Sequence, residues 1–199
     1  NRPYSDLAME SITSNTSLYL LGTFLIVLLL GACATTSDIS RLEAINRPVD
    51  LQRFMGDWYV IGSIPIDMWF ASEAGAHNGL ESYVLRDDGK IQTTYTFRKD
   101  GFDGERTQFN PLAWVYNTDT NAEWRMQFLW PFRSAYLIAY LDDDYQNTVI
   151  GVPDRSYVWI MSRQHDLSDE KYARLIDVVT ELGYDASLVQ RIPQQWPEL

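Results

Sequence analysis

The side chains that most often carry out chemistry are few in this sequence and do not cluster. The only histidines are His77 and His165. A catalytic zinc site normally needs three protein ligands, so two histidines without a His-Glu-x-x-His motif predict no metal centre. The chain contains neither a glycine-rich phosphate loop nor a Gly-x-Ser-x-Gly nucleophile elbow. We interpret the acidic run 142–144 as a solvated turn, so the sequence predicts no catalytic constellation and no cofactor.

The single cysteine, Cys33, stands at a position that predicts lipid attachment. The apolar run 18–30 before it is shorter than the roughly 18 residues that span a bilayer, and suits the apolar region of a secretory signal. Leu-Gly-Ala-Cys follows at once and resembles the bacterial lipobox, in which a signal is cut before a cysteine that receives diacylglycerol. The alternative is a buried or free cysteine after an ordinary signal.

These features divide the chain into three expected parts. We predict a leader and signal peptide over residues 1–32, a lipidated polar tether over 33–47 and a folded domain over 48–199. Ala34, rather than an aspartate, follows the cysteine. By resemblance to bacterial lipoproteins, this favours transfer to the outer membrane, with the domain on its periplasmic side.

The charge of the chain argues against two classes of function. Its 27 acidic residues against 16 basic residues give a formal net charge of −11. Such a surface repels phosphate backbones and anionic head groups, so nucleic-acid binding and charge-driven membrane adhesion are not expected.

Short apolar stretches with turn signals every ten to fifteen residues indicate an all-β domain. Regular short connections favour an antiparallel meander, and eight strands closing on themselves leave room for one small ligand. The expected strands are Asp57–Pro65, Leu80–Arg86, Lys90–Arg98, Thr107–Tyr116, Glu123–Leu129, Ala135–Leu141, Asn147–Val152 and Tyr157–Arg163.

Alternation along these strands predicts which side chains point into the barrel. In the first strand Trp58, Val60 and Gly62 share one face. The register is open in the strands that hold Tyr83 and Ala113, where both faces are partly apolar. The predicted interior set is Trp58, Val60, Tyr83, Thr93, Tyr95, Phe97, Ala113, Trp124, Met126, Phe128, Tyr136, Ile138, Tyr140, Trp159 and Met161.

The first connection and the end of the chain depart from this pattern. Residues 66–78 form a long loop that contains Trp69 and Phe70, and loops of this length are usually lids or binding loops. The alternative is a loop packed over an ordinary core. Residues 168–183 predict one helix, with Ser168 as its cap, Gly183 at its end and an apolar stripe to cover the outside of the barrel. Residues 189–192 predict a last short strand.

Three short motifs in this order resemble the lipocalin family, and most closely its bacterial outer-membrane lipoproteins. They are Gly56-Asp57-Trp58 at the first strand, Asp144-Tyr145 before a late strand, and Arg163 at the end of the last strand. The resemblance covers residues 47–196. It implies an eight-stranded up-and-down barrel with one C-terminal α-helix packed outside, and an Arg163 side chain stacked on Trp58 at the closed end.

The resemblance also implies a function. The protein would bind, store or transport fatty acids or lysophospholipids without turning them over, held to the membrane by its lipid anchor and with a homodimer left open. Ligand contacts would come from Trp69 and Phe70 at the mouth and from part of the interior set: Val60, Tyr83, Tyr95, Phe97, Ala113, Met126, Phe128, Tyr136, Ile138, Tyr140 and Trp159. Related bacterial lipocalins often have glutamate where this chain has Val60, so no deep charged anchor is expected.

Two alternatives remain. One is a structural envelope lipoprotein whose barrel is filled by its aromatic side chains. The other is an enzyme acting on a barrel-bound lipid, which would need an acid–base pair inside the barrel. Alternation along the strands suggests no such pair.

Overall fold

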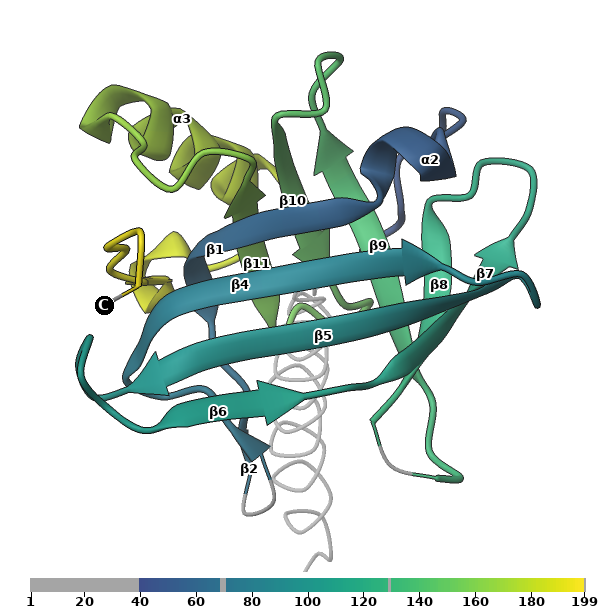
Figure 1. The fold of residues 1–199 in the computed structure, drawn as a ribbon. Helices are drawn as coiled ribbons and strands as arrows, with labels where there is room; N and C mark the ends of the chain where they lie inside the picture. Colours follow the sequence, from purple (N-terminus) through teal and green to yellow (C-terminus); the bar gives the residue numbers. More distant parts are fainter. Residues whose placement is uncertain (1–39, 69–70, 129, 199) are drawn as a thin grey trace, which may run out of the picture. The chain divides into compact units, whose positions relative to one another are not determined.

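An antiparallel sheet that closes on itself dominates the computed structural model (Figure 1). Its long strands follow one another in the order β11-β10-β9-β8-β7-β5-β4-β1, and β1 pairs with β11 to complete an eight-stranded barrel. This is the predicted fold. The strands are β1 (Gly56–Ile64), β4 (Ala76–Leu85), β5 (Lys90–Lys99), β7 (Leu112–Asn117), β8 (Glu123–Gln127), β9 (Ser134–Leu141), β10 (Asn147–Gly151) and β11 (Val158–Ser162).

The structure describes residues 40–68, 71–128 and 130–198, and a compact unit begins at Arg41. The predictions for the signal, for Cys33 and for Trp69 and Phe70 therefore lie outside the described residues. No helix within the described ranges is both long and apolar enough to cross a bilayer.

The expected strand over residues 107–116 is divided in two by Pro111. The pieces are β6 (Arg106–Phe109) and β7, and both pair with β5. Proline lacks the N–H that a continuous ladder would need. Its carbonyl instead accepts hydrogen bonds from the backbone N–H and the hydroxyl of Thr93, at 3.2 and 2.7 Å.

Two β-bulges change which side chains face inward. In β1 the pairing with β11 shifts between Val60 and Gly62, and a Cβ added to Gly62 would lie 3.0 Å from Tyr172 on the outer helix. Gly62 therefore does not share the inner face with Trp58, as strict alternation predicted. One extra residue in a strand reverses the facing of every residue beyond it.

The second bulge lies in β9 and corrects the prediction for Tyr140. Ile150 of β10 pairs with Ile138, whereas the next residue back, Val149, pairs with Tyr140. Ala139 is the extra residue. Tyr140 consequently packs against a second apolar cluster on the outside of the barrel, which we call the outer apolar cluster and which includes Ile61, Leu137, Val149, Ile160, Leu175 and Val179. Tyr140 does not line the interior, and Leu141 takes its place in the inner core.

The outer apolar cluster is covered by the predicted helix, α3 (Asp169–Glu181). Ser168 caps it by accepting the N–H of Lys171, and Gly183 follows its end with φ of +83°, a conformation that favours glycine. Leu175 and Val179 are its buried contacts with the barrel. A short helix η1 (Ala186–Leu188) and the predicted last strand, β12 (Gln190–Arg191), follow, and β12 pairs with β1.

The closed end is held by Arg163, as the resemblance implies. Its guanidinium lies 3.8 Å from the centre of the Trp58 ring, a stacking geometry suited to this planar cation. The same group donates hydrogen bonds of 2.6–2.9 Å to the carbonyls of Arg53, Phe54, Met55 and Asp57. It thereby joins the end of β11 to the turn between α2 (Leu51–Phe54) and β1.

Two further motif positions also lie at the closed end. Gly56 begins β1 with φ of +90°. The Tyr145 hydroxyl accepts the N–H of Asp50, the residue that caps α2. The Asp144 carbonyl accepts the side-chain N–H of Gln146, whereas the Asp142 carboxylate accepts the backbone N–H groups of Gln146 and Asn147.

Residues 41–47, expected as the end of the tether, pack against the barrel. Leu42 is buried in the outer cluster, and its N–H donates to Pro153. The N–H of Ile45 donates to the carbonyl of Ile138 in β9. The packed domain therefore begins at Arg41, within the span that the sequence assigned to the tether.

Candidate ligand-binding cavity

The closed half of the barrel interior is filled by aromatic rings. Phe54 contacts Trp58, Tyr83 and Trp124, with ring centres 5.1, 5.6 and 5.4 Å apart. All four side chains are buried. Several predicted interior residues belong to this packed core and do not line the cavity: Val60, Tyr83, Tyr95, Phe97, Ala113 and Ile138. Their buried inward placement agrees with the predicted alternation.

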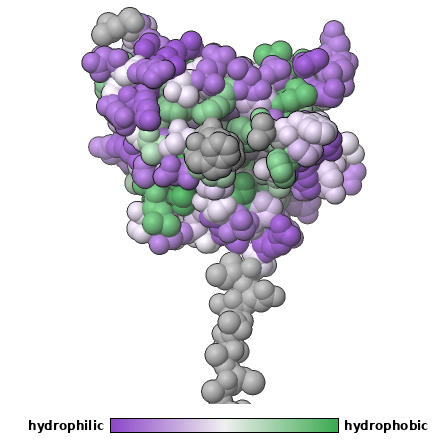
Figure 2. Space-filling view, turned by 90° about the horizontal axis from the view of Figure 1, so that it is seen from below, coloured by the Kyte–Doolittle hydropathy of each residue, from purple (hydrophilic) through white to green (hydrophobic). Residues whose placement is uncertain are grey.

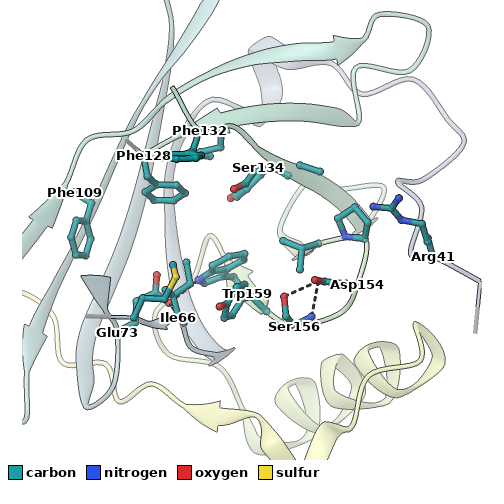
Figure 3. Close-up of a pocket in the computed structure, with 17 residues that line it drawn as sticks. Arg41, Ile66, Glu73, Phe109, Phe128, Phe132, Ser134, Asp154, Ser156 and Trp159 are labelled. Carbon is teal, nitrogen blue, oxygen red and sulfur yellow. Dashed lines mark hydrogen bonds between the residues drawn. The ribbon is translucent and has the colours of Figure 1, made fainter. Parts of the chain in front are cut away.

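The open half contains a cavity of about 630 Å³ (Figure 3). Most of the side chains that line it are apolar, and they come from the first connection, the end of β6, the β8–β9 hairpin and the β10–β11 hairpin. Four of the predicted ligand-contact residues line it: Met126, Phe128, Tyr136 and Trp159. The cavity is thus smaller and nearer the mouth than a tunnel along the whole barrel.

Apolar side chains also reach the surface around this mouth. Phe128 and Phe132 line the cavity yet are exposed, and Trp130 at the tip of the same hairpin is 81% exposed. Seen from below, apolar side chains interrupt an otherwise hydrophilic face (Figure 2).

The first connection brings a carboxyl group into this cavity. Two short strands, β2 (Asp67–Met68) and β3 (Ala71–Ser72), pair as a hairpin. The residues on either side of this hairpin, Ile66 and Glu73, are both buried. One Glu73 oxygen accepts the indole N–H of Trp159 at 3.1 Å and the N–H of Ile66 at 3.3 Å. Burial raises the pKa of Glu73 from 4.5 to about 7, against the opposing effect of these hydrogen bonds.

A second carboxyl, that of Glu81, lies deeper in the interior. Glu81 pairs with Trp58 in β1 and with Tyr95 in β5, and both partners face inward. Burial, and then the negative charge of Glu73, raise the pKa of Glu81 well above its ordinary value.

Tyrosine hydroxyls complete this level of the barrel. Tyr136 bonds through its hydroxyl to that of Tyr83, and its ring stacks between Trp124 and Trp159. The Tyr95 hydroxyl is fully buried and has no hydrogen-bond partner within residues 40–68, 71–128 and 130–198. We call Glu73, Glu81, Tyr95 and Tyr136 the polar layer. It lies between the cavity and the packed floor, which is the cluster of the Phe54, Trp58, Tyr83 and Trp124 rings.

Sequence reasoning missed both carboxyl groups of the polar layer. The expectation of no acid–base pair and no charged anchor inside the barrel is therefore wrong. Glu81 has the same strand parity as Tyr83, so strict alternation from Tyr83 would have placed it inside, but the predicted set omitted it. Glu73 lies in a loop, where no periodicity indicates the direction of a side chain. In the described part of the chain, no three histidine, cysteine, aspartate or glutamate residues are grouped to hold a metal ion.

A closed eight-stranded meander with a one-ended cavity and an outer helix defines a class of small-ligand-binding barrels. The sequence matches the family model described as a lipocalin-like domain over residues 49–194. The chain belongs to the lipocalin family.

Two curated relatives illustrate the range of the family. Temperature-induced lipocalin-1 of Arabidopsis thaliana is 32% identical over 164 residues, which cover 75% of this chain and 82% of the relative. Outer membrane lipoprotein Blc of Escherichia coli strain K12 is 30% identical over 159 residues, which cover 78% and 85%. The family and the cavity together support the binding of a small hydrophobic ligand.

Solved structures share the fold at low sequence identity. The cockroach allergen Per a 4 superimposes with a TM-score of 0.57 at 15% identity, covering 79% of this chain and 96% of the allergen. Insecticyanin from the tobacco hornworm Manduca sexta gives a TM-score of 0.55 at 16% identity, covering 81% and 87%.

Proposed function

We propose that this protein binds, stores or transports membrane-derived single-chain lipids, such as fatty acids or lysophospholipids, in the open half of its barrel. The observation that carries the proposal is the largely apolar cavity of about 630 Å³ above a packed floor. Its volume falls within the range of roughly 300–1,000 Å³ typical of ligand pockets. The cavity also argues against the alternative of a barrel filled solid by its aromatics.

The expected affinity follows from burial of the acyl chain. Each buried methylene contributes about 0.8 kcal/mol, so a chain of about sixteen carbons gains on the order of 12 kcal/mol if fully enclosed. Association and ordering of the chain oppose this by several kcal/mol or more. The difference corresponds to dissociation constants near micromolar.

We expect affinity to rise with chain length and then level off when the cavity is full. The test is a titration of lipid-free protein with fatty acids of increasing length, followed by tryptophan emission and calorimetry, at pH 6 where Glu73 is mostly protonated. Surface adsorption would instead continue to strengthen with length. Absence of a saturable signal at every length by both methods would contradict the proposal.

Two leucine substitutions locate the bound chain in the same titration. Trp159→Leu removes part of the cavity wall and should weaken binding roughly tenfold. Tyr140→Leu is the matched control, because Tyr140 lies outside the barrel wall against α3 and should leave the affinity unchanged.

The proposed place of action is the periplasmic side of the bacterial outer membrane, with a lipid anchor at Cys33. Two supports are the lipobox-like Leu-Gly-Ala-Cys and the relative Blc, which is itself an outer membrane lipoprotein. Two or more acyl chains give stable anchoring, where one gives only reversible binding.

Cys33→Ser in the chain with its leader is expected to release the protein from the membrane fraction or to leave it uncleaved. Cell fractionation and the mass of the product measure this. A cleaved serine variant that stays in the membrane fraction would contradict the anchor.

An enzyme acting on a bound lipid is a second candidate, favoured by one observation. Glu73, with a pKa of about 7 and facing the cavity, suits general acid–base catalysis near neutral pH. Mass spectrometry of lipids recovered after incubation distinguishes the two functions. An unchanged lipid supports a carrier, and a converted lipid whose formation stops in Glu73→Gln supports an enzyme.

A further inference from the structure

The polar layer bears on which polar group a ligand can bring into the barrel. Glu73 borders the cavity directly and Glu81 lies one level deeper, close enough that their charges oppose each other. Arg41, the one basic side chain among the described residues that line the cavity, lies on the opposite side from Glu73 (Figure 3). A carboxylate or phosphate placed at the polar layer would therefore meet two acids, while the described cations act from further away: Arg41 from the opposite side of the cavity, and Arg163 on Tyr83 from the closed end.

The polar layer contains unused hydrogen-bonding capacity. The Tyr95 hydroxyl is buried without a partner in the described residues, and both carboxyl groups influence it electrostatically. The Glu81 carboxyl is buried opposite Tyr95, and burial, together with the charge of Glu73, raises its pKa well above the ordinary value. Buried polar groups are normally satisfied, and Glu73 is the member of this pair of acids that lines the cavity, so a ligand group that enters there meets its carboxyl first.

We infer that the polar layer selects a ligand whose polar group donates hydrogen bonds, a long-chain primary amine or alcohol, over a carboxylate of the same chain length. An N–H or O–H group can donate to Glu73 or Glu81, whereas an ionised carboxylate only accepts. This inference rests on the proposed function and narrows it to a head-group class.

The test compares three ligands with the same twelve-carbon chain: dodecylamine, dodecanol and dodecanoate. Calorimetric titration of the lipid-free full chain at pH 7 should show the amine and the alcohol binding at least tenfold more tightly than the carboxylate. Dodecylamine should also release protons, measured in buffers of different ionisation enthalpy, because a cation at the layer favours ionisation of the acids. The groups that face it there are Glu73, Glu81, Tyr83, Tyr95 and Tyr136.

Matched variants separate the polar layer from the acidic surface. In Glu73→Gln/Glu81→Gln the preference should fall below twofold and proton release should stop. Asp87→Asn removes one exposed charge in the β4–β5 turn and should keep both the head-group preference and the proton release. If the double variant does not fold, the two single variants Glu73→Gln and Glu81→Gln replace it, each expected to reduce the preference.

The outcomes distinguish this inference from the proposed function. A carboxylate that binds as tightly as the amine and the alcohol, or a preference that survives in the glutamine variants, would overturn the inference while length-dependent lipid binding stands. Absence of calorimetric binding by all three ligands would reject the proposed function itself.

Discussion

Replacement of Trp58 by alanine is expected to lower the free energy of unfolding by about 3–5 kcal/mol. The Trp58 side chain is fully buried, packs 5.1 Å from the ring of Phe54 and donates its indole N–H to the Phe54 carbonyl at 2.9 Å. Its loss leaves a cavity in the floor and removes the surface on which Arg163 stacks. Chemical denaturation measures the change.

Two comparisons make this prediction specific. Trp130→Ala removes the same kind of side chain from a site that is 81% exposed, and should change stability by less than about 0.5 kcal/mol. Arg163→Lys should destabilise, because an ammonium group cannot both stack on the ring and reach four carbonyls. A Trp58→Ala variant as stable as the wild type would show that the floor does not hold the barrel together.

Glu73→Gln is expected to make the protein more stable at pH 8 and to have little effect at pH 4. The Glu73 carboxyl has a pKa of about 7 when folded against 4.5 as its ordinary value. The unfolded chain therefore loses its proton first as pH rises, and stability falls between these two values. The decrease in the free energy of unfolding that comes from Glu73 amounts to about 3 kcal/mol and is complete above pH 7.

Denaturation at pH 4 and pH 8 tests this expectation. Glutamine keeps the oxygen that accepts the N–H groups of Trp159 and Ile66, so the variant removes the titration and not the hydrogen bonds. Glu181→Gln, at an exposed position at the end of α3, is the control and should follow the wild-type profile. Parallel pH profiles for wild type and Glu73→Gln would mean that the Glu73 carboxyl is hydrated in solution.

Strand positions could be predicted because turn chemistry and alternation are local. Asp87-Asp88-Gly89 and Pro153-Asp154 mark hairpins that the structure contains, and Tyr95, Phe97 and Met126 face inward as their parity indicates. The bulge at Ala139 has no such local signal, because its three neighbours Ile138, Tyr140 and Leu141 suit either face of a strand. Tyr140 was therefore assigned to the wrong side.

The polar layer could be predicted only in part. Glu81 was within reach of the sequence, since it shares the parity of Tyr83. An acidic residue at an inward position among aromatic residues indicates a polar site inside the barrel. Glu73 depends on how the first connection folds back, a tertiary property that neither spacing nor propensity encodes.

The packed floor closes one end of the barrel, and the cavity opens at the other end. In the described part of the chain, Phe54, Trp58, Tyr83 and Trp124 fill the far end, so a small hydrophobic ligand in the cavity cannot leave through it. Loading and unloading must share one entrance, and a resident molecule has to depart before its successor enters. If the protein binds a ligand as proposed, exchange is consequently sequential, and release through the mouth lined by Phe128 and Phe132 limits its rate.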